Sequence, residues 1–148
     1  EYADAVRKIL ILATRGIRIF DPDLARLGLE NQENALLLRR FLTAAPNNTL
    51  RIVLRNAEPF RRNSPRLFKL LTDFPHLMQV WECAPQLARL TDAMFLSDDC
   101  HALVRIHQDH ARSRVIVDNA EACRPYLTRF DEILEEGGTP VSATTLGL

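Results

Sequence analysis

A group of basic and imidazole side chains in residues 101–107 is the first candidate for chemistry in this sequence. His101, Arg105 and His107 occupy alternate positions, with small or branched apolar residues between them. Alternation with a period of two is typical of a β-strand, so these three side chains should share one face of it. Two imidazoles and a guanidinium on one face could bind an anion such as phosphate. The alternative is a solvated face, because antiparallel strands commonly leave one side in water.

A second candidate lies where two short apolar segments end. Asp21 follows the segment 17–20, and Arg55 closes the segment 50–55. If these segments are parallel strands, their carboxyl ends meet at one end of a sheet, where open α/β sheets tend to bind ligands. We therefore place Arg55 with the candidate anion-binding residues. The alternative is an ordinary ion pair or a turn cap.

Metal chemistry has weaker support. The segment His107-Gln108-Asp109-His110 carries side chains that can bind metals. A protein metal site needs three or four converging ligands, and no helical H-E-x-x-H motif or distant His pair supplies the others. We therefore predict no metal site and no cofactor.

A short basic run lies near the middle of the chain. Its members fall within 61–69 and are Arg61, Arg62, Arg66 and Lys69. Such a run is usually a solvated helix face. Nucleic-acid binding would favour interleaved aromatic rings, and Phe60 and Phe68 could supply them. Phe68 fits better as an inward residue because its neighbours are apolar.

Composition limits the class of protein. The chain has 148 residues, 47% of them hydrophobic and 26% charged, which fits one globular domain. Its 19 basic and 19 acidic residues give no net charge, which argues against bulk electrostatic binding to nucleic acid or membrane. No apolar run is long enough for a membrane span. Three cysteines without a C-x-x-C spacing favour a reducing cytoplasm. The chain starts without Met, so the sequence leaves open whether a segment precedes it.

The periodicity predicts an α/β domain over residues 1–148, with a loosely docked tail at 139–148. Helices are expected over 2–14, 31–45, 64–74 and 122–136, and strands over 17–20, 50–55, 77–81, 92–98, 101–107 and 114–117. Early strand–helix alternation implies right-handed crossovers and a parallel core. The later strands follow too closely for crossovers and should form hairpins. The result is a mixed sheet with a parallel core and helices on both faces.

This order of elements resembles one half of the phospholipase D-like superfamily. In that family one strand carries H-x-K-x4-D, the next strand carries a G-S-x-N-like segment, and a strand and helix close the unit. Counting back from Asp98 places the family's Lys on Ala93 and its His on Thr91. The second segment falls near 106–109, and 114–136 looks like the closing unit. The chain also resembles a proteobacterial group with a degenerate half of this kind.

The resemblance implies a scaffold without its catalysis. The family attacks a phosphodiester with the His and helps to neutralise the phosphate with the Lys, and neither Thr91 nor Ala93 can do this. Asp98 alone fits a turn or capping role. The first hypothesis is therefore a non-catalytic binding or interaction module, with a phosphate-containing molecule as one class of ligand. The alternatives are a phosphodiesterase or nuclease with a displaced site built from Arg105, His107 and His110, and a nucleic-acid-binding module that uses 61–69.

The resemblance also implies a homodimer, because catalytic members join two halves. The strand at 92–98 and its neighbour would then form the contact. Met94, Leu96 and Leu103 would give that surface its apolar character.

Overall fold

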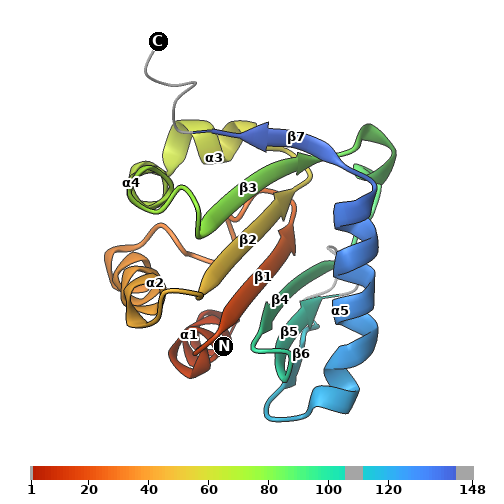
Figure 1. Ribbon diagram of the computed structural model, residues 1–148. Helices are drawn as coiled ribbons and strands as arrows, with labels where there is room; N and C mark the ends of the chain where they lie inside the picture. Colours follow the sequence, from red (N-terminus) through yellow and green to blue (C-terminus); the bar gives the residue numbers. More distant parts are fainter. Residues whose placement is uncertain (1, 106–111, 143–148) are drawn as a thin grey trace.

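The computed structural model describes residues 2–105 and 112–142 (Figure 1). Its helices are α1 (Tyr2–Leu12), α2 (Gln32–Ala44), α3 (Glu58–Asn63), α4 (Pro65–Asp73) and α5 (Ala120–Glu135), with a 3-10 turn, η1 (Pro85–Leu87). Its strands are β1 (Gly16–Asp21), β2 (Thr49–Leu54), β3 (Met78–Cys83), β4 (Ala93–Ser97), β5 (His101–Arg105), β6 (Arg114–Ile116) and β7 (Gly138–Val141). Within the described ranges, no helix combines the length and apolar character that a membrane span requires.

The strands form one seven-stranded sheet in the order β6-β5-β4-β1-β2-β3-β7. β1 pairs with β2 and β2 with β3 in parallel, as expected for two crossover connections. The remaining neighbours, β1–β4, β4–β5, β5–β6 and β3–β7, are antiparallel. The predicted mixed sheet with a parallel core is therefore confirmed.

Helices cover both faces of this sheet, as predicted. In Figure 1, α1, α2 and α4 lie on one side and α5 lies on the other. The first face buries alternate strand residues such as Ile19, Ile52 and Leu103. The second buries Phe20 and its neighbours against Phe130 and other residues of α5. Burial on both faces explains why the central strands are nearly continuous apolar runs.

The start of α4 is capped from outside the helix. Pro65 takes the first helical position, where Pro is favoured, but the preceding Ser64 side chain makes no capping hydrogen bond. The Glu30 carboxylate accepts instead from the backbone N–H groups of Arg66 at 2.9 Å and Leu67 at 3.0 Å. The cap therefore comes from a loop distant in sequence, and it ties that loop to the helix.

The predicted dimer interface is wrong in its location. Met94 and Leu96 are 2% and 1% exposed and pack toward α5, and Leu103 is 1% exposed in the core beneath the other helices. β4 and β5 also have strand neighbours on both sides. These apolar residues therefore belong to the core and cannot form the predicted contact. The homodimer itself stays a prediction.

The C-terminal region also differs from its prediction. The strand at 114–116 is not the last one, because β7 pairs with β3 and places Thr139 and Pro140 in the sheet. Gly138 lies so close to β3 that a Cβ there would collide with the carbonyl oxygen of Glu82. The first part of the expected loose tail is thus a strand, and 143–148 lie outside the described residues.

Candidate anion-binding site

Four charged residues meet at one end of the sheet, which we call the carboxyl end because β1, β2 and β3 finish there. Asp21 is the last residue of β1, and Arg55 directly follows β2. The antiparallel hairpin brings its open end to the same place, because Ala93 at the start of β4 pairs with Arg105 at the end of β5. Asp92 immediately precedes β4. The parallel core and the hairpin together therefore assemble the site.

Arg105 is the most buried of these cations, with only 4% of the residue exposed. Its guanidinium carbon lies 5.7 Å from the centre of the Tyr2 ring in α1, a cation–π arrangement. Its Nε atom is buried, and no described residue accepts a hydrogen bond from it. Most buried donors in folded proteins have a partner, so this unpaired N–H is unusual.

Arg55 approaches from the opposite face of the sheet. Its guanidinium carbon lies 5.9 Å from the centre of the Phe20 ring, which belongs to the core beneath α5. Its backbone N–H donates to the carbonyl oxygen of Asp21 at 3.1 Å, which fixes the residue beside β1. The Nη2 atom is buried without an acceptor among the described residues. Burial lowers the pKa of Arg55, and Arg105 acts in the same direction, so the two cations influence one another.

Asp21 is 2% exposed and accepts two hydrogen bonds from its own turn. Its Oδ2 accepts from the N–H groups of Leu24 at 2.7 Å and Asp23 at 3.2 Å. Burial nevertheless raises the pKa of Asp21 above its ordinary value, because these bonds and the Arg105 charge offset burial only in part. The turn-cap interpretation of Asp21 is confirmed.

Asp92 has a different partner. Its carboxylate accepts from Arg129 of α5 through Nε at 2.6 Å and Nη2 at 3.2 Å, a bidentate pair. The hydrogen bond to Asp92 raises the pKa of Arg129. The carboxylate of Asp92 is thus paired with Arg129. Among the described residues at this end, Arg55 and Arg105 have buried donors without acceptors.

The opposite end of the sheet holds Asp98. It lies in the β4–β5 turn with φ of 55°, a conformation that Asp tolerates in tight turns. Its carboxylate accepts from the N–H of Thr14 at 2.7 Å, the hydroxyl of Thr14 at 2.9 Å, the N–H of Arg15 at 2.7 Å and the N–H of Gly16 at 3.0 Å. Burial alone would raise the pKa of Asp98, but these hydrogen bonds outweigh it and hold the pKa below its ordinary value. The predicted turn or capping role is confirmed.

The strand direction separates the residues of the resemblance. Thr91 and Ala93 lie at the carboxyl end, whereas Asp98 lies at the far end of β4, roughly 17 Å away at the usual rise of a strand. Thr91 is exposed and Ala93 is 2% exposed. These three positions therefore do not converge on one site.

The strand β5 divides the predicted anion set. His101 begins the strand at the Asp98 end, is 8% exposed, and accepts the N–H of Asp118 at its Nδ1 at 3.0 Å. The predicted grouping of His101 with Arg105 is wrong, because residues four positions apart on a strand lie about 13 Å apart. The alternative of a solvated face is also wrong, since all five residues of β5 are buried. His107, His110 and the metal-capable segment lie outside the described residues. Among those described, no cluster of His, Cys, Asp or Glu could hold a metal.

The basic run on α3 and α4 is largely paired. Arg62 contacts Glu58 at 3.0 Å, Lys69 contacts Asp73 at 3.1 Å, and Arg66 contacts Glu30 at 3.8 Å. Phe60 and Phe68 pack against one another in the core, with ring centres 4.8 Å apart. The inward prediction for Phe68 is confirmed, and neither ring is free to stack on a base.

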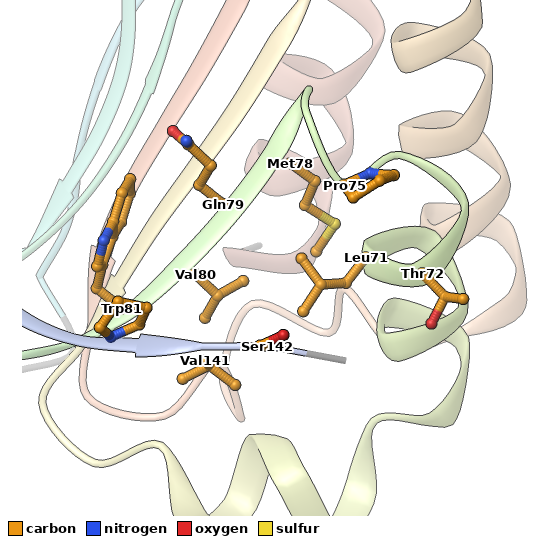
Figure 2. A pocket seen from close by; sticks show the side chains of 10 residues that line it. Leu71, Thr72, Pro75, Met78, Gln79, Val80, Trp81, Val141 and Ser142 are labelled. Atoms are coloured by element: carbon orange, nitrogen blue, oxygen red, sulfur yellow. The ribbon is translucent and has the colours of Figure 1, made fainter. Parts of the chain in front are cut away.

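A pocket of about 510 Å³ lies elsewhere, between α4 and the β3–β7 end of the sheet (Figure 2). Figure 2 shows Leu71, Met78, Val80 and Val141 on the same side of β3, facing this pocket. Its lining contains no charged residue and consists of Leu71, Thr72, Pro75, Met78, Gln79, Val80, Trp81, Pro140, Val141 and Ser142. It could not bind an anion through charge.

Sequence reasoning found Arg55 and Arg105 but missed Tyr2, Asp92 and Arg129. Tyr2 reads as an ordinary helix residue, and the Asp92–Arg129 pair joins positions 37 residues apart. Asp92 immediately precedes a strand. The tendency of ligands to bind at strand ends is the sequence signal that could have placed Asp92 among the candidate site residues.

Comparison with known proteins gives a family and a fold. The family described as "Domain of unknown function (DUF7931)" matches residues 1–142. No curated protein matches the chain significantly. Among solved structures, the chain is similar to TrmBL2, described as an archaeal chromatin protein with a novel mode of DNA binding. The TM-score is 0.61 at 14% identity, over 91% of this chain and 50% of that chain, so the two share a fold. The present chain thus corresponds to about half of TrmBL2.

Proposed function

The chain belongs to the DUF7931 family, and we propose that it is a non-catalytic domain that binds a phosphate-containing ligand at the carboxyl end of its sheet. The observation that carries the proposal is the pair of buried guanidinium donors without acceptors, Nη2 of Arg55 and Nε of Arg105, among the described residues. They come from separate strands and from opposite faces of the sheet.

The chemistry of these groups favours an oxyanion. A buried donor without a partner costs about 1–3 kcal/mol, and more when it is charged, so an acceptor that fills both positions gains affinity. Guanidinium groups match phosphate oxygens because they present several N–H donors in one plane. The location agrees with the tendency of open α/β sheets to bind ligands at the carboxyl ends of their strands.

The absence of catalysis is part of the proposal. Thr91 and Ala93 occupy the positions where the resemblance requires a nucleophile and a cation, and a methyl side chain cannot replace a Lys. The family description and the description of TrmBL2 do not mention phospholipase D, so a degenerate phospholipase D-like half is our interpretation.

The test is a titration of the folded protein with inorganic phosphate, followed by NMR of the Arg Nε–H signals and by calorimetry. We expect saturable binding that Arg55→Met and Arg105→Met each weaken by about tenfold, the equivalent of one lost charge-assisted hydrogen bond. Arg62→Met is the matched control, because Arg62 lies on an exposed helix face in a pair with Glu58. Binding that is absent, or equally affected by all three substitutions, overturns the proposal.

The same preparations test the lack of catalysis. We expect no turnover of bis-p-nitrophenyl phosphate. Turnover that disappears in His107→Ala would favour the displaced phosphodiesterase site instead.

Nucleic-acid binding is a second candidate function, and the specific observation in its favour is the fold shared with TrmBL2. DNA binding is described for TrmBL2 as a whole, and the match to this chain covers 50% of the TrmBL2 chain. Here the basic residues Arg62, Arg66 and Lys69 have acidic partners, and the chain has no net charge. Titration with duplex DNA decides this candidate. An affinity that falls by orders of magnitude between about 50 and 200 mM salt, and that falls further in Arg61→Glu/Arg62→Glu, would establish it.

A further inference from the structure

We infer that the ligand group held between Arg55 and Arg105 is a terminal phosphate, a phosphomonoester dianion, and not a phosphodiester within a nucleic-acid backbone. This inference rests on the proposed function and names the ligand class for the same site. It follows from the balance of charge at the carboxyl end and from the burial and directions of the two donors.

Among the described residues, three of the four carboxylates near this end have partners of their own. Asp92 is held by Arg129 in a bidentate pair. Glu82 accepts the N–H of Ala57 at 2.8 Å and so serves the start of α3. Asp23 accepts the N–H of Ala25 at 3.0 Å in its own turn.

Asp21 supplies one negative charge, which acts on both guanidinium groups. Tyr2 stays neutral, because burial raises its pKa from an already basic value. Arg26, on the exposed turn, has interactions of its own. The charges of Arg55 and Arg105 therefore share the single charge of Asp21 and are left without a full counter-charge. A phosphomonoester supplies close to two negative charges at neutral pH, whereas a phosphodiester supplies one.

The geometry of the site also favours a terminal phosphate over a phosphate within a nucleic-acid backbone. Arg105 is 4% exposed beside Tyr2 of α1, and Arg55 is half-buried beside Phe20 on the other face. A group between them has protein on two sides. A monoester has three free oxygens and one covalent continuation, so it can enter such a place end-on. A backbone diester has two free oxygens and must continue in both directions.

The experiment compares two small probes that differ by one methyl group. The folded protein is titrated at pH 7.5 with methyl phosphate and with dimethyl phosphate, and the Nε–H signals of Arg55 and Arg105 are followed by NMR. We expect methyl phosphate to bind at least about tenfold more tightly, because a second unit charge some 4 Å from a guanidinium is worth more than 1 kcal/mol at an effective dielectric constant near 20. Arg55→Lys should keep part of this preference, since it retains charge and loses the planar fork.

The outcomes separate the inference from the function on which it rests. Equal binding of the two esters that Arg55→Met weakens overturns the monoester inference and leaves the phosphate-binding function standing. No binding of either ester, or binding that Arg55→Met does not change, overturns both. Arg55 is half-buried, so the Arg55→Met variant keeps the test available if Arg105→Met fails to fold.

Discussion

The two ends of the sheet each hold a buried aspartate, and the two carboxylates behave in opposite ways. Asp98 receives four hydrogen bonds, and its pKa falls below the ordinary value. Asp21 receives two from its own turn, and burial raises its pKa. The hydrogen bonds outweigh burial at Asp98 and offset it only in part at Asp21, so the two pKa values move in opposite directions.

The neighbours of these aspartates show the same contrast. At the Asp98 end the carboxylate and the donors of the α1–β1 link satisfy one another. At the Asp21 end two buried guanidinium donors have no acceptor among the described residues. The carboxylate at the first end already has its donors, whereas two donors at the second end lack acceptors. The first carboxylate therefore has a structural role, and the second end is where we propose binding.

The largest effect should come from Asp98→Asn. The variant keeps a residue that tolerates positive φ, but an amide cannot accept from all the donors that the carboxylate serves. We expect a loss of about 2–4 kcal/mol in the free energy of unfolding at pH 7, since hydrogen bonds to a charged group contribute about 1.5–3 kcal/mol each and are not additive. Urea unfolding followed by circular dichroism measures it. A loss below 1 kcal/mol would remove the contrast between the two ends.

The Asp98→Asn variant should also differ from the wild type in how its stability depends on pH. Because folding lowers the pKa of Asp98, its contribution to stability is present above the unfolded pKa of about 3.9 and is lost as the pH falls through the folded pKa. The wild-type protein should therefore lose stability steeply on acidification, and Asp98→Asn should lose less over the same range.

An intermediate effect is expected for Arg105→Met. The substitution removes a buried charge with an unpaired Nε and keeps an unbranched side chain beside Tyr2. The free energy of unfolding should change by less than about 1.5 kcal/mol, because replacing an incompletely paired buried ion with an apolar side chain is often neutral or stabilising. Phosphate binding should nevertheless weaken by about tenfold. A loss of 3 kcal/mol or more would make Arg105 a structural residue like Asp98.

Asp21→Asn should have the smallest effect. Folding raises the pKa of Asp21, so the folded state binds more protons than the unfolded state and stability falls as the pH rises through the folded pKa. The variant lacks this decline and should be more stable than the wild type at pH 7 by less than about 1 kcal/mol, with little difference near pH 4. Urea midpoints at several pH values measure the gap. A variant that loses stability as the pH rises would contradict the assignment.

Much of the fold could be predicted from the sequence, because its central strands and helices have long, clear periodicity. The elements that were missed are short: α3 has six residues and β7 has four, two of them Gly138 and Pro140. The strand at 138–141 exists because it pairs with β3, more than fifty positions earlier in the chain. Local patterns do not contain such information.

The site was predicted in part, for a related reason. Alternation correctly placed His101 and Arg105 on one strand, but it specifies the face of a side chain and not its position along the sheet. The strand-end rule was more informative, because it selected Arg55 and Asp21 by the end of the sheet that they occupy. The partnership of Asp92 with Arg129 depends on how α5 packs across the sheet, which the sequence pattern does not specify.

The position of Asp98 has a consequence for how fast the protein folds and unfolds. The β4–β5 hairpin in which it lies is local, and such hairpins form in about 1–10 μs. Its bonds to Thr14, Arg15 and Gly16 join residues 82 to 84 positions apart, so they require the closure of a long loop and should form late. A contact that is absent from the transition state affects mainly the unfolding rate. Asp98 would then act as a kinetic latch, which lengthens the lifetime of the folded domain while leaving its rate of folding nearly unchanged.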